Sequence, residues 1–164
     1  MKLIKTTTDR MGGLHAVYAI PLSCFGEVER DYATGHYDIT LSSTSGVLAF
    51  PTDGGEACSF VEKKERDEHG DYWQPVVSGV IPSPGIDNAI DVETLERGEW
   101  LVLCEDGLGN IRLCGDAEVP LTFSTETATG TLSADRNQVG YTFTGKLGHP
   151  SYIIETTLED LHLP

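Results

Sequence analysis

The chain has 164 residues, which suits one globular domain over residues 1–164 and is too short for two full hydrophobic cores. Its 26 Asp and Glu residues outnumber 11 Lys and Arg residues and give a formal net charge of −15. That charge excludes a protein held to nucleic-acid phosphates or to an anionic bilayer by electrostatic attraction. No apolar run approaches the roughly 18–20 residues of a membrane-spanning helix, so we expect a soluble domain.

The N-terminal segment does not have the features of an exported protein. Its mildly apolar stretch over 11–22 is diluted by glycines and a histidine, and no small-residue cleavage site follows. We therefore expect cytoplasmic synthesis without export. Scattered cysteines are typical of unpaired, buried thiols in a reducing compartment, and a structural disulfide is the less favoured alternative. The cysteines are Cys24, Cys58, Cys104 and Cys114.

The first third of the chain alternates short apolar runs with turn residues, a pattern typical of β-strands. Residues 13–22 predict a strand that ends near Pro21, which lacks a ladder donor and suits an edge or a strand end. Residues 36–41 alternate apolar and polar side chains, as a half-buried strand does. The Ser/Thr-rich run 42–46 leads into residues 47–50, so we expect these two strands to form a hairpin.

Residues 58–81 predict a long hairpin with two apolar base segments and a polar tip. The tip has too few apolar residues to be buried on either face, so it should project, with its turn near 68–71. A solvated surface hairpin and a contact arm both fit this pattern. The aromatic residues beside the tip favour contact, because aromatic residues are enriched in interface cores. The candidate assembly contacts are Glu65, Arg66, Tyr72 and Trp73.

The second half predicts one short helix and then several strands. Asp91 can cap a helix over 91–97, and Gly98 would terminate it. The apolar run 100–104 predicts a strand covered on both faces, with the helix as one candidate cover. Cys104 and Cys114 flank a turn signal at 106–110 and should lie close on neighbouring strands. Further strands are predicted at 111–114, 121–124, 139–144 and 152–154, followed by a short helix or a flexible tail at 156–164.

These elements predict a mainly β fold: an antiparallel β-sandwich or barrel of about eight to ten strands, with one short internal helix and a protruding hairpin. Motifs that carry chemistry are not found: the sequence has no C-x-x-C, H-x-x-x-H or G-x-S-x-G spacing. The acidic tip 67–71 lacks the regular ligand alternation of a calcium loop, and Gly107-Leu108-Gly109 starts a phosphate-loop pattern that Arg112 breaks. We therefore predict no catalytic, cofactor-binding or metal-binding residues.

Two stretches carry a family resemblance: GGLHAVYAIP at 12–21, and residues 100–152 with WLVLCEDGLGNIRLCGD and FSTETATGTLSADRNQVGYTFTG. They resemble structural proteins of phages and prophages from Bacteroidetes-type bacteria, of the tail-tube-like sort. The matching stretches cover somewhat under half of the chain, and their motifs consist of turn and strand residues. The resemblance implies a β-sandwich or barrel with one flanking helix that assembles into rings stacked through a protruding hairpin or loop, and it assigns no functional residue.

We therefore expect a non-enzymatic structural component of a phage or prophage virion, tail-tube or neck-like, that is made in the bacterial host cytoplasm and located in the virion. Its partners would be copies of itself in rings or stacked rings and other virion proteins, without cofactors, nucleic-acid affinity or membrane contact. Residues 87–126 contain ten acidic and two basic residues, a local charge of −8, and are a candidate for a DNA-repelling lumen surface; acidic surfaces also serve solubility. The alternatives are a small-ligand or glycan-binding β-sandwich module with Trp73 or Trp100 as stacking platform, and an enzyme whose site is assembled from distant residues.

Overall fold

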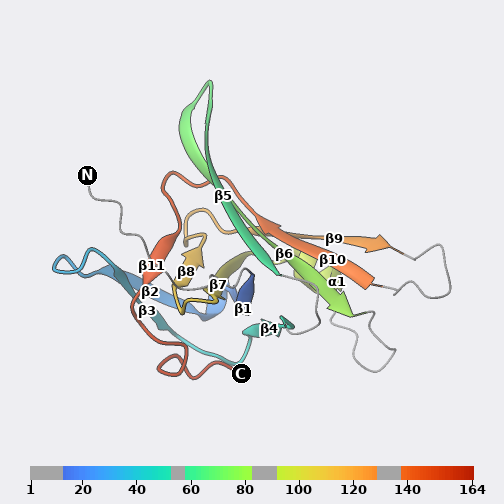
Figure 1. Ribbon diagram of the computed structural model, residues 1–164, viewed down its shortest axis with the longest axis horizontal. Helices are drawn as coiled ribbons and strands as arrows, with labels where there is room; N and C mark the ends of the chain where they lie inside the picture. The colour runs from blue at the N-terminus through green and yellow to red at the C-terminus, as the bar shows by residue number, and fades with distance from the viewer. Residues whose placement is uncertain (1–12, 53–57, 83–91, 129–137) are drawn as a thin grey trace.

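The computed structural model describes residues 13–52, 58–82, 92–128 and 138–164, and the described chain forms two β-sheets (Figure 1). The seven-stranded sheet has the order β2-β3-β11-β8-β7-β1-β4, and the four-stranded sheet has the order β5-β6-β10-β9. The mainly β fold with a protruding hairpin is confirmed. The elements are β1 (Leu14–Pro21), η1 (Leu22–Cys24), β2 (Phe25–Arg30), β3 (Tyr37–Leu41), β4 (Leu48–Phe50), β5 (Ser59–Asp67), β6 (Gly70–Pro82), α1 (Val92–Arg97), β7 (Trp100–Asp106), β8 (Ile111–Cys114), β9 (Thr122–Ala128), β10 (Gln138–Thr144) and β11 (Tyr152–Ile154).

Strand pairing departs from the prediction in the first third of the chain. Strands β3 and β4 do not form a hairpin: β3 pairs with β2 and, in parallel, with β11, whereas β4 pairs with β1. The reason is that the two strands bury their apolar residues in different cores. Phe50 of β4 packs in the cluster between the sheets, and Ile39 of β3 packs in the cluster on the opposite face of the seven-stranded sheet. Strand β2 was not predicted, because its polar sequence has no buried residue.

The seven-stranded sheet is buried on both faces along its centre. In β7, Val102 and Cys104 face the four-stranded sheet, while Leu101 and Leu103 face the second apolar cluster. All four are at most 1% exposed, which confirms the prediction of a doubly covered strand. Four aromatic rings fill the space between the sheets, with centroid separations from 4.6 to 6.4 Å: Phe50, Phe123, Tyr141 and Phe143.

The predicted helix is confirmed as α1, and its predicted cap, Asp91, lies outside the described residues. Leu95 is the buried residue of the helix, and its carbonyl accepts a hydrogen bond of 2.8 Å from the Trp100 indole Nε1–H. Thr125 Oγ1 of β9 donates to Glu96 Oε1 at 2.8 Å. These contacts fix the helix against β9 and the start of β7.

The C-terminal residues pack on the second apolar cluster. Leu161 is 8% exposed, and Leu158 and Leu163 contact the same cluster. The Thr157 hydroxyl accepts the Asp160 N–H at 3.2 Å and closes a turn. Residues 156–164, for which the sequence left a short helix or a flexible tail open, form a docked turn, and their leucines cover apolar surface that the seven-stranded sheet would otherwise expose to water.

Candidate functional site

The hairpin arm, defined as residues 62–75, is the part of β5 and β6 that extends beyond the rest of the four-stranded sheet (Figure 1). Strand β10 pairs with β6 only over Val76–Pro82, whereas β5 and β6 remain paired out to Asp67 and Gly70. Among the described strands, β5 and β6 are thus each other's only ladder partners along the arm. One isolated bridge supports the base of the arm: the N–H groups of Trp73 and Leu147 donate to each other's carbonyls, both at 2.8 Å.

A tight turn at Glu68 and His69 closes the arm, as the sequence predicted. Asp67 Oδ1 accepts the His69 N–H at 2.8 Å. Gly70 has a φ of +123°, a conformation that residues with a Cβ rarely adopt. No group of three or more His, Cys, Asp or Glu side chains in the described parts of the chain is arranged to hold a metal ion. The hydrogen bond that Asp67 accepts from the backbone two residues later is the contact that favours Asp in turns.

One face of the arm carries Glu65 and Tyr72. They are directly opposite in the ladder, and the Tyr72 hydroxyl donates to Glu65 Oε2 at 2.7 Å. This hydrogen bond raises the pKa of Tyr72, so the phenol remains a donor at neutral pH. Lys146 Nζ lies 4.4 Å from the centroid of the Tyr72 ring and 3.5 Å from Asp67 Oδ2. The aromatic ring on this face is therefore held between a carboxylate and an ammonium group.

The opposite face of the arm carries Arg66 and Trp73. Lys64 Nζ lies 5.0 Å from the centroid of the Trp73 ring and 2.8 Å from Asp71 Oδ2. Arg66 Nε lies 3.5 Å from Asp71 Oδ1. The structure therefore places the four predicted contact residues on one arm but on two faces, because directly opposite residues share a face and successive residues alternate.

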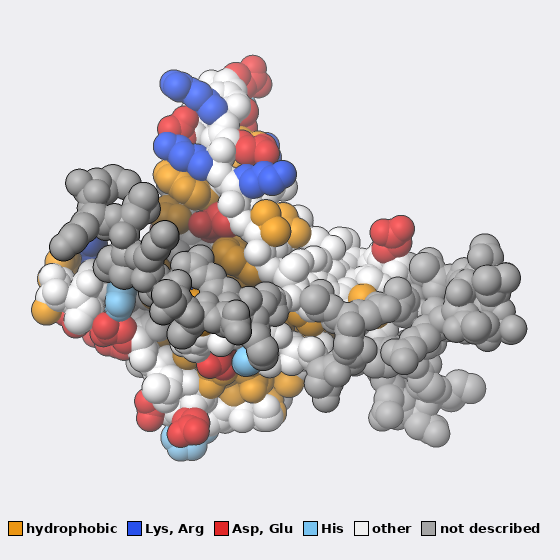
Figure 2. All heavy atoms as spheres, viewed as in Figure 1, with side chains coloured by type: hydrophobic (Ala, Val, Ile, Leu, Met, Phe, Trp, Pro, Cys, Tyr) orange, Lys and Arg blue, Asp and Glu red, His pale blue; other side chains and the backbone are white. Residues whose placement is uncertain are grey.

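Basic side chains lie on the arm among acidic ones (Figure 2). The described residues contain seven Lys and Arg, and four of them lie on the arm or beside it. Lys146 was missed by sequence reasoning, because it follows β10 and reaches the arm only through the bridge at Leu147. The four residues are Lys63, Lys64, Arg66 and Lys146.

The acidic residues of 87–126 do not make one continuous surface within the described residues. Glu93 and Glu96 lie on α1, which precedes β7, whereas Asp106 ends β7. A strand of seven residues spans about 23 Å, and α1 contacts the start of β7 through Leu95 and Trp100, so these carboxylates lie near opposite ends of that strand. Only part of the segment can therefore face any one partner.

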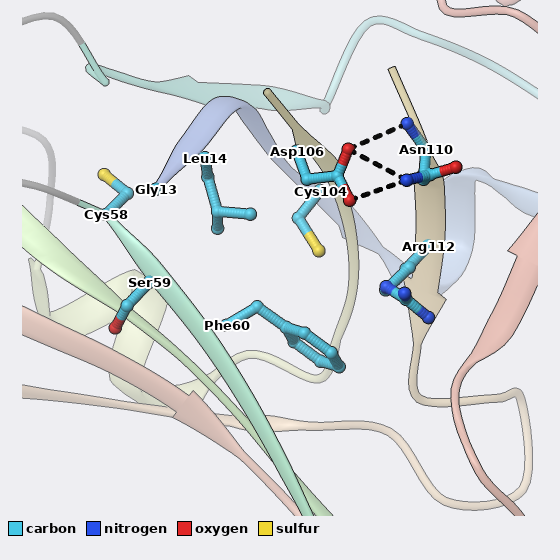
Figure 3. Close-up of a pocket in the computed structure, with 9 residues that line it drawn as sticks. All are labelled: Gly13, Leu14, Cys58, Ser59, Phe60, Cys104, Asp106, Asn110 and Arg112. Atoms are coloured by element: carbon cyan, nitrogen blue, oxygen red, sulfur yellow. Dashed lines mark hydrogen bonds between the residues drawn. The ribbon is translucent and has the colours of Figure 1, made fainter. Parts of the chain in front are cut away.

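A second feature is a cavity of about 290 Å³ at one end of the sandwich (Figure 3). Leu14, Phe60 and Cys104 contribute its apolar wall, and Asp106 and Arg112 contribute charged groups. The Asp106 carboxylate organises the β7–β8 turn. Its Oδ1 accepts the N–H groups of Leu108 and Asn110 at 2.9 and 3.0 Å, and the Asn110 amide donates to both carboxylate oxygens. Burial opposes its ionisation, but these hydrogen bonds lower the pKa of Asp106 overall.

The thiols around the cavity are unpaired and buried. Cys104 and Cys114 lie on the paired strands β7 and β8, as predicted, and their mutual hydrogen bond together with burial raises the pKa of Cys104. Burial and a hydrogen bond with Cys58 raise the pKa of Tyr141, whose Oη lies 3.4 Å from Cys58 Sγ. Cys104 and Tyr141 are therefore protonated at neutral pH, and the buried Cys104 behaves as a small core side chain.

Of the two tryptophans considered as stacking platforms, Trp100 is 5% exposed and belongs to the core between the sheets. It is not a platform, because its ring packs beneath Gly98, where an added Cβ would lie 2.6 Å from the indole nitrogen. Within the described residues, no helix has the length and apolar character to cross a membrane. Comparison with protein-family models, with curated proteins and with solved structures finds no match for this chain.

Proposed function

We propose that the chain is a non-enzymatic structural component of a phage or prophage virion, tail-tube or neck-like, that assembles into homo-oligomeric rings. The hairpin arm would contact a neighbouring copy of the chain. The observation that carries the proposal is that the outer part of the arm, residues 65–72, has no further described strand of its sheet beside it, since β10 stops pairing with β6 at Val76 and the bridge from Trp73 to Leu147 supports only the base. A two-stranded hairpin is only marginally stable in water, so an arm of this length gains stability when it packs on a partner.

The distribution of charge supports contact between the arm of one copy and the body of the next. Residues 62–75 and Lys146 contain five acidic and four basic groups, a net charge of −1, which leaves −14 of the chain's −15 on the remainder. Two bodies therefore repel each other, whereas an arm with a net charge of −1 meets little electrostatic repulsion from a body. Unlike surfaces that meet head to tail form rings or stacks when the rotation closes.

The test shortens the arm at a position that the structure defines. Lys64 and Trp73 are directly opposite in the ladder, so replacing residues 65–72 with Asn-Gly should close a two-residue hairpin there. The variant keeps the bridge between Trp73 and Leu147. We expect it to fold, as judged by circular dichroism, and to lose the rings or stacks that the wild-type chain forms in light scattering and electron microscopy.

A matched control removes charge of the same kind elsewhere. The Glu93–Arg97 pair on α1 is exposed, so the double change to Gln should leave assembly intact. Wild-type assembly should strengthen as salt rises, because the Debye length falls from about 10 Å at 0.1 M to about 3 Å at 1 M and the repulsion between the acidic bodies is screened. A shortened variant that still assembles like the wild type would contradict the role of the arm. A wild-type chain that stays monomeric both alone and with other virion proteins would contradict the assembly itself.

A further inference from the structure

Arg112 occupies a core-facing position in β8. It lies directly opposite Cys104 of β7, which packs between the two sheets. Its neighbours in sequence, Ile111 and Leu113, point to the cluster on the other face. The guanidinium therefore extends into the space between the sheets, toward Phe60 of β5 (Figure 3). Arg112 is half-buried, so its guanidinium loses part of its hydration, a cost that a bound anion would offset.

The described residues supply no ion pair within 4.0 Å for this arginine; the nearby charge is the Asp106 carboxylate, whose pKa Arg112 helps to lower. Its guanidinium carbon lies 5.5 Å from the centroid of the Phe60 ring. Asp106 lines the same cavity but accepts hydrogen bonds from its own turn, and Glu62 accepts two hydrogen bonds from Ser151. The guanidinium N–H groups of Arg112 therefore have no hydrogen-bond acceptor among the described residues, although Asp106 shares the cavity, and they are available to an anion that enters it.

The cavity beside Arg112 fixes the size and character of that anion. Its volume of about 290 Å³ is near the lower limit of small-molecule pockets, which run from about 300 to 1,000 Å³. Leu14, Phe60 and the Cys104 thiol make the wall apolar. One arginine matches the two oxygens of a carboxylate through parallel hydrogen bonds. A phosphate dianion would need further donors and would meet the negative field of the whole chain.

We propose that this pocket binds a small carboxylate with a compact apolar body. The carboxylate pairs with Arg112, and the apolar body packs against Leu14 and Phe60. The site contains none of the arm residues, so it is independent of the assembly described above.

Titration of the full chain with benzoate, followed by methyl NMR, tests the site. We expect saturable shifts of the Leu14 methyl signals with a dissociation constant of about 1 mM, as suits a ligand of this size. Benzamide, which has the same shape without the charge, should bind at least about tenfold more weakly. In R112Q, benzoate affinity should fall by about ten- to a hundredfold. R97Q is the matched control, because it removes an exposed arginine on α1, and it should bind like the wild type.

Each outcome decides the proposal. Equal shifts with benzoate and benzamide would overturn the carboxylate recognition. Benzoate that leaves the Leu14 methyls unmoved up to about 20 mM would overturn the site. Unchanged benzoate affinity in a folded R112Q variant would overturn the role of the arginine. Should R112Q fail to fold, the comparison of benzoate with benzamide at Leu14 in the wild-type chain remains decisive.

Discussion

Replacing Trp100 by Phe measures how strongly the indole ties α1 to the sandwich. The Leu95 carbonyl accepts the indole N–H at 2.8 Å and also the Gly98 N–H at 3.2 Å. Loss of the indole donor therefore leaves this carbonyl one partner and should cost about 1 kcal/mol. The smaller ring leaves a void of roughly 40 Å³ at a residue only 5% exposed, which adds about 1 kcal/mol. We expect W100F to lower the free energy of unfolding by about 2 kcal/mol.

Urea unfolding followed by circular dichroism checks this value. With a slope of about 2 kcal/mol per molar urea, the midpoint should fall by about 1 M. The control is W73F, because Trp73 is half-buried and its bridge to Leu147 is made by backbone atoms that Phe retains. W73F should shift the midpoint by less than about 0.5 M. Equal shifts in the two variants, or an unchanged midpoint in W100F, would refute the assigned coupling between helix and strand.

Two further predictions concern acid stability and core packing. Burial opposes ionisation of Asp116, but hydrogen bonds from the His149 ring, 2.6 Å away, and from two backbone N–H groups lower the pKa of Asp116 overall. The stabilisation by ionised Asp116 is present above the unfolded pKa, about 3.9, and is lost as pH falls through the folded pKa. In D116N the urea midpoint should therefore fall less steeply than in the wild type below about pH 5. A fall as steep as the wild type's would disprove the role of Asp116 in acid stability. In G79A the new Cβ would lie 2.6 Å from Tyr141 Oη, so the melting temperature should fall by about 2–10 °C. Gly148 has open space around it, so G148A should leave the melting temperature nearly unchanged. Equal melting temperatures for the two variants would exclude the clash.

Local chemistry explains which elements could be predicted. The arm and the β7–β8 hairpin are each closed by a carboxylate that accepts backbone hydrogen bonds within a few residues. The carboxylates belong to Asp67 in the arm and to Asp106 in the β7–β8 hairpin. Glycines with positive φ, Gly70 and Gly109, complete these turns. The helix likewise follows from a short local pattern that ends at Gly98. Within each of these elements the signals lie only a few residues apart in the chain, so they can be recognised without knowing the fold.

The choice of strand partners could not be predicted in the same way. A period of two shows that 36–41 is a strand, but not which strand it pairs with. Strand β3 joins β11 through Tyr37 and Ile154, more than a hundred residues apart. The candidate sites share this dependence, because Lys146 reaches the arm through the Leu147 bridge, and Arg112 becomes an inward charge only when β8 pairs with β7.

The sequence by itself determined a mainly β chain with one helix, a polar hairpin and a strongly acidic surface, because turn chemistry, alternation and charge are local or additive properties. Only the tertiary structure decided how far the hairpin stands clear of its sheet and which residues line the cavity. Both depend on which apolar faces meet, and this is settled by burying the largest apolar area consistent with paired backbone groups. Val76, where β10 stops, and Arg112, where a charge faces the core, are therefore positions whose meaning appears only in the folded chain.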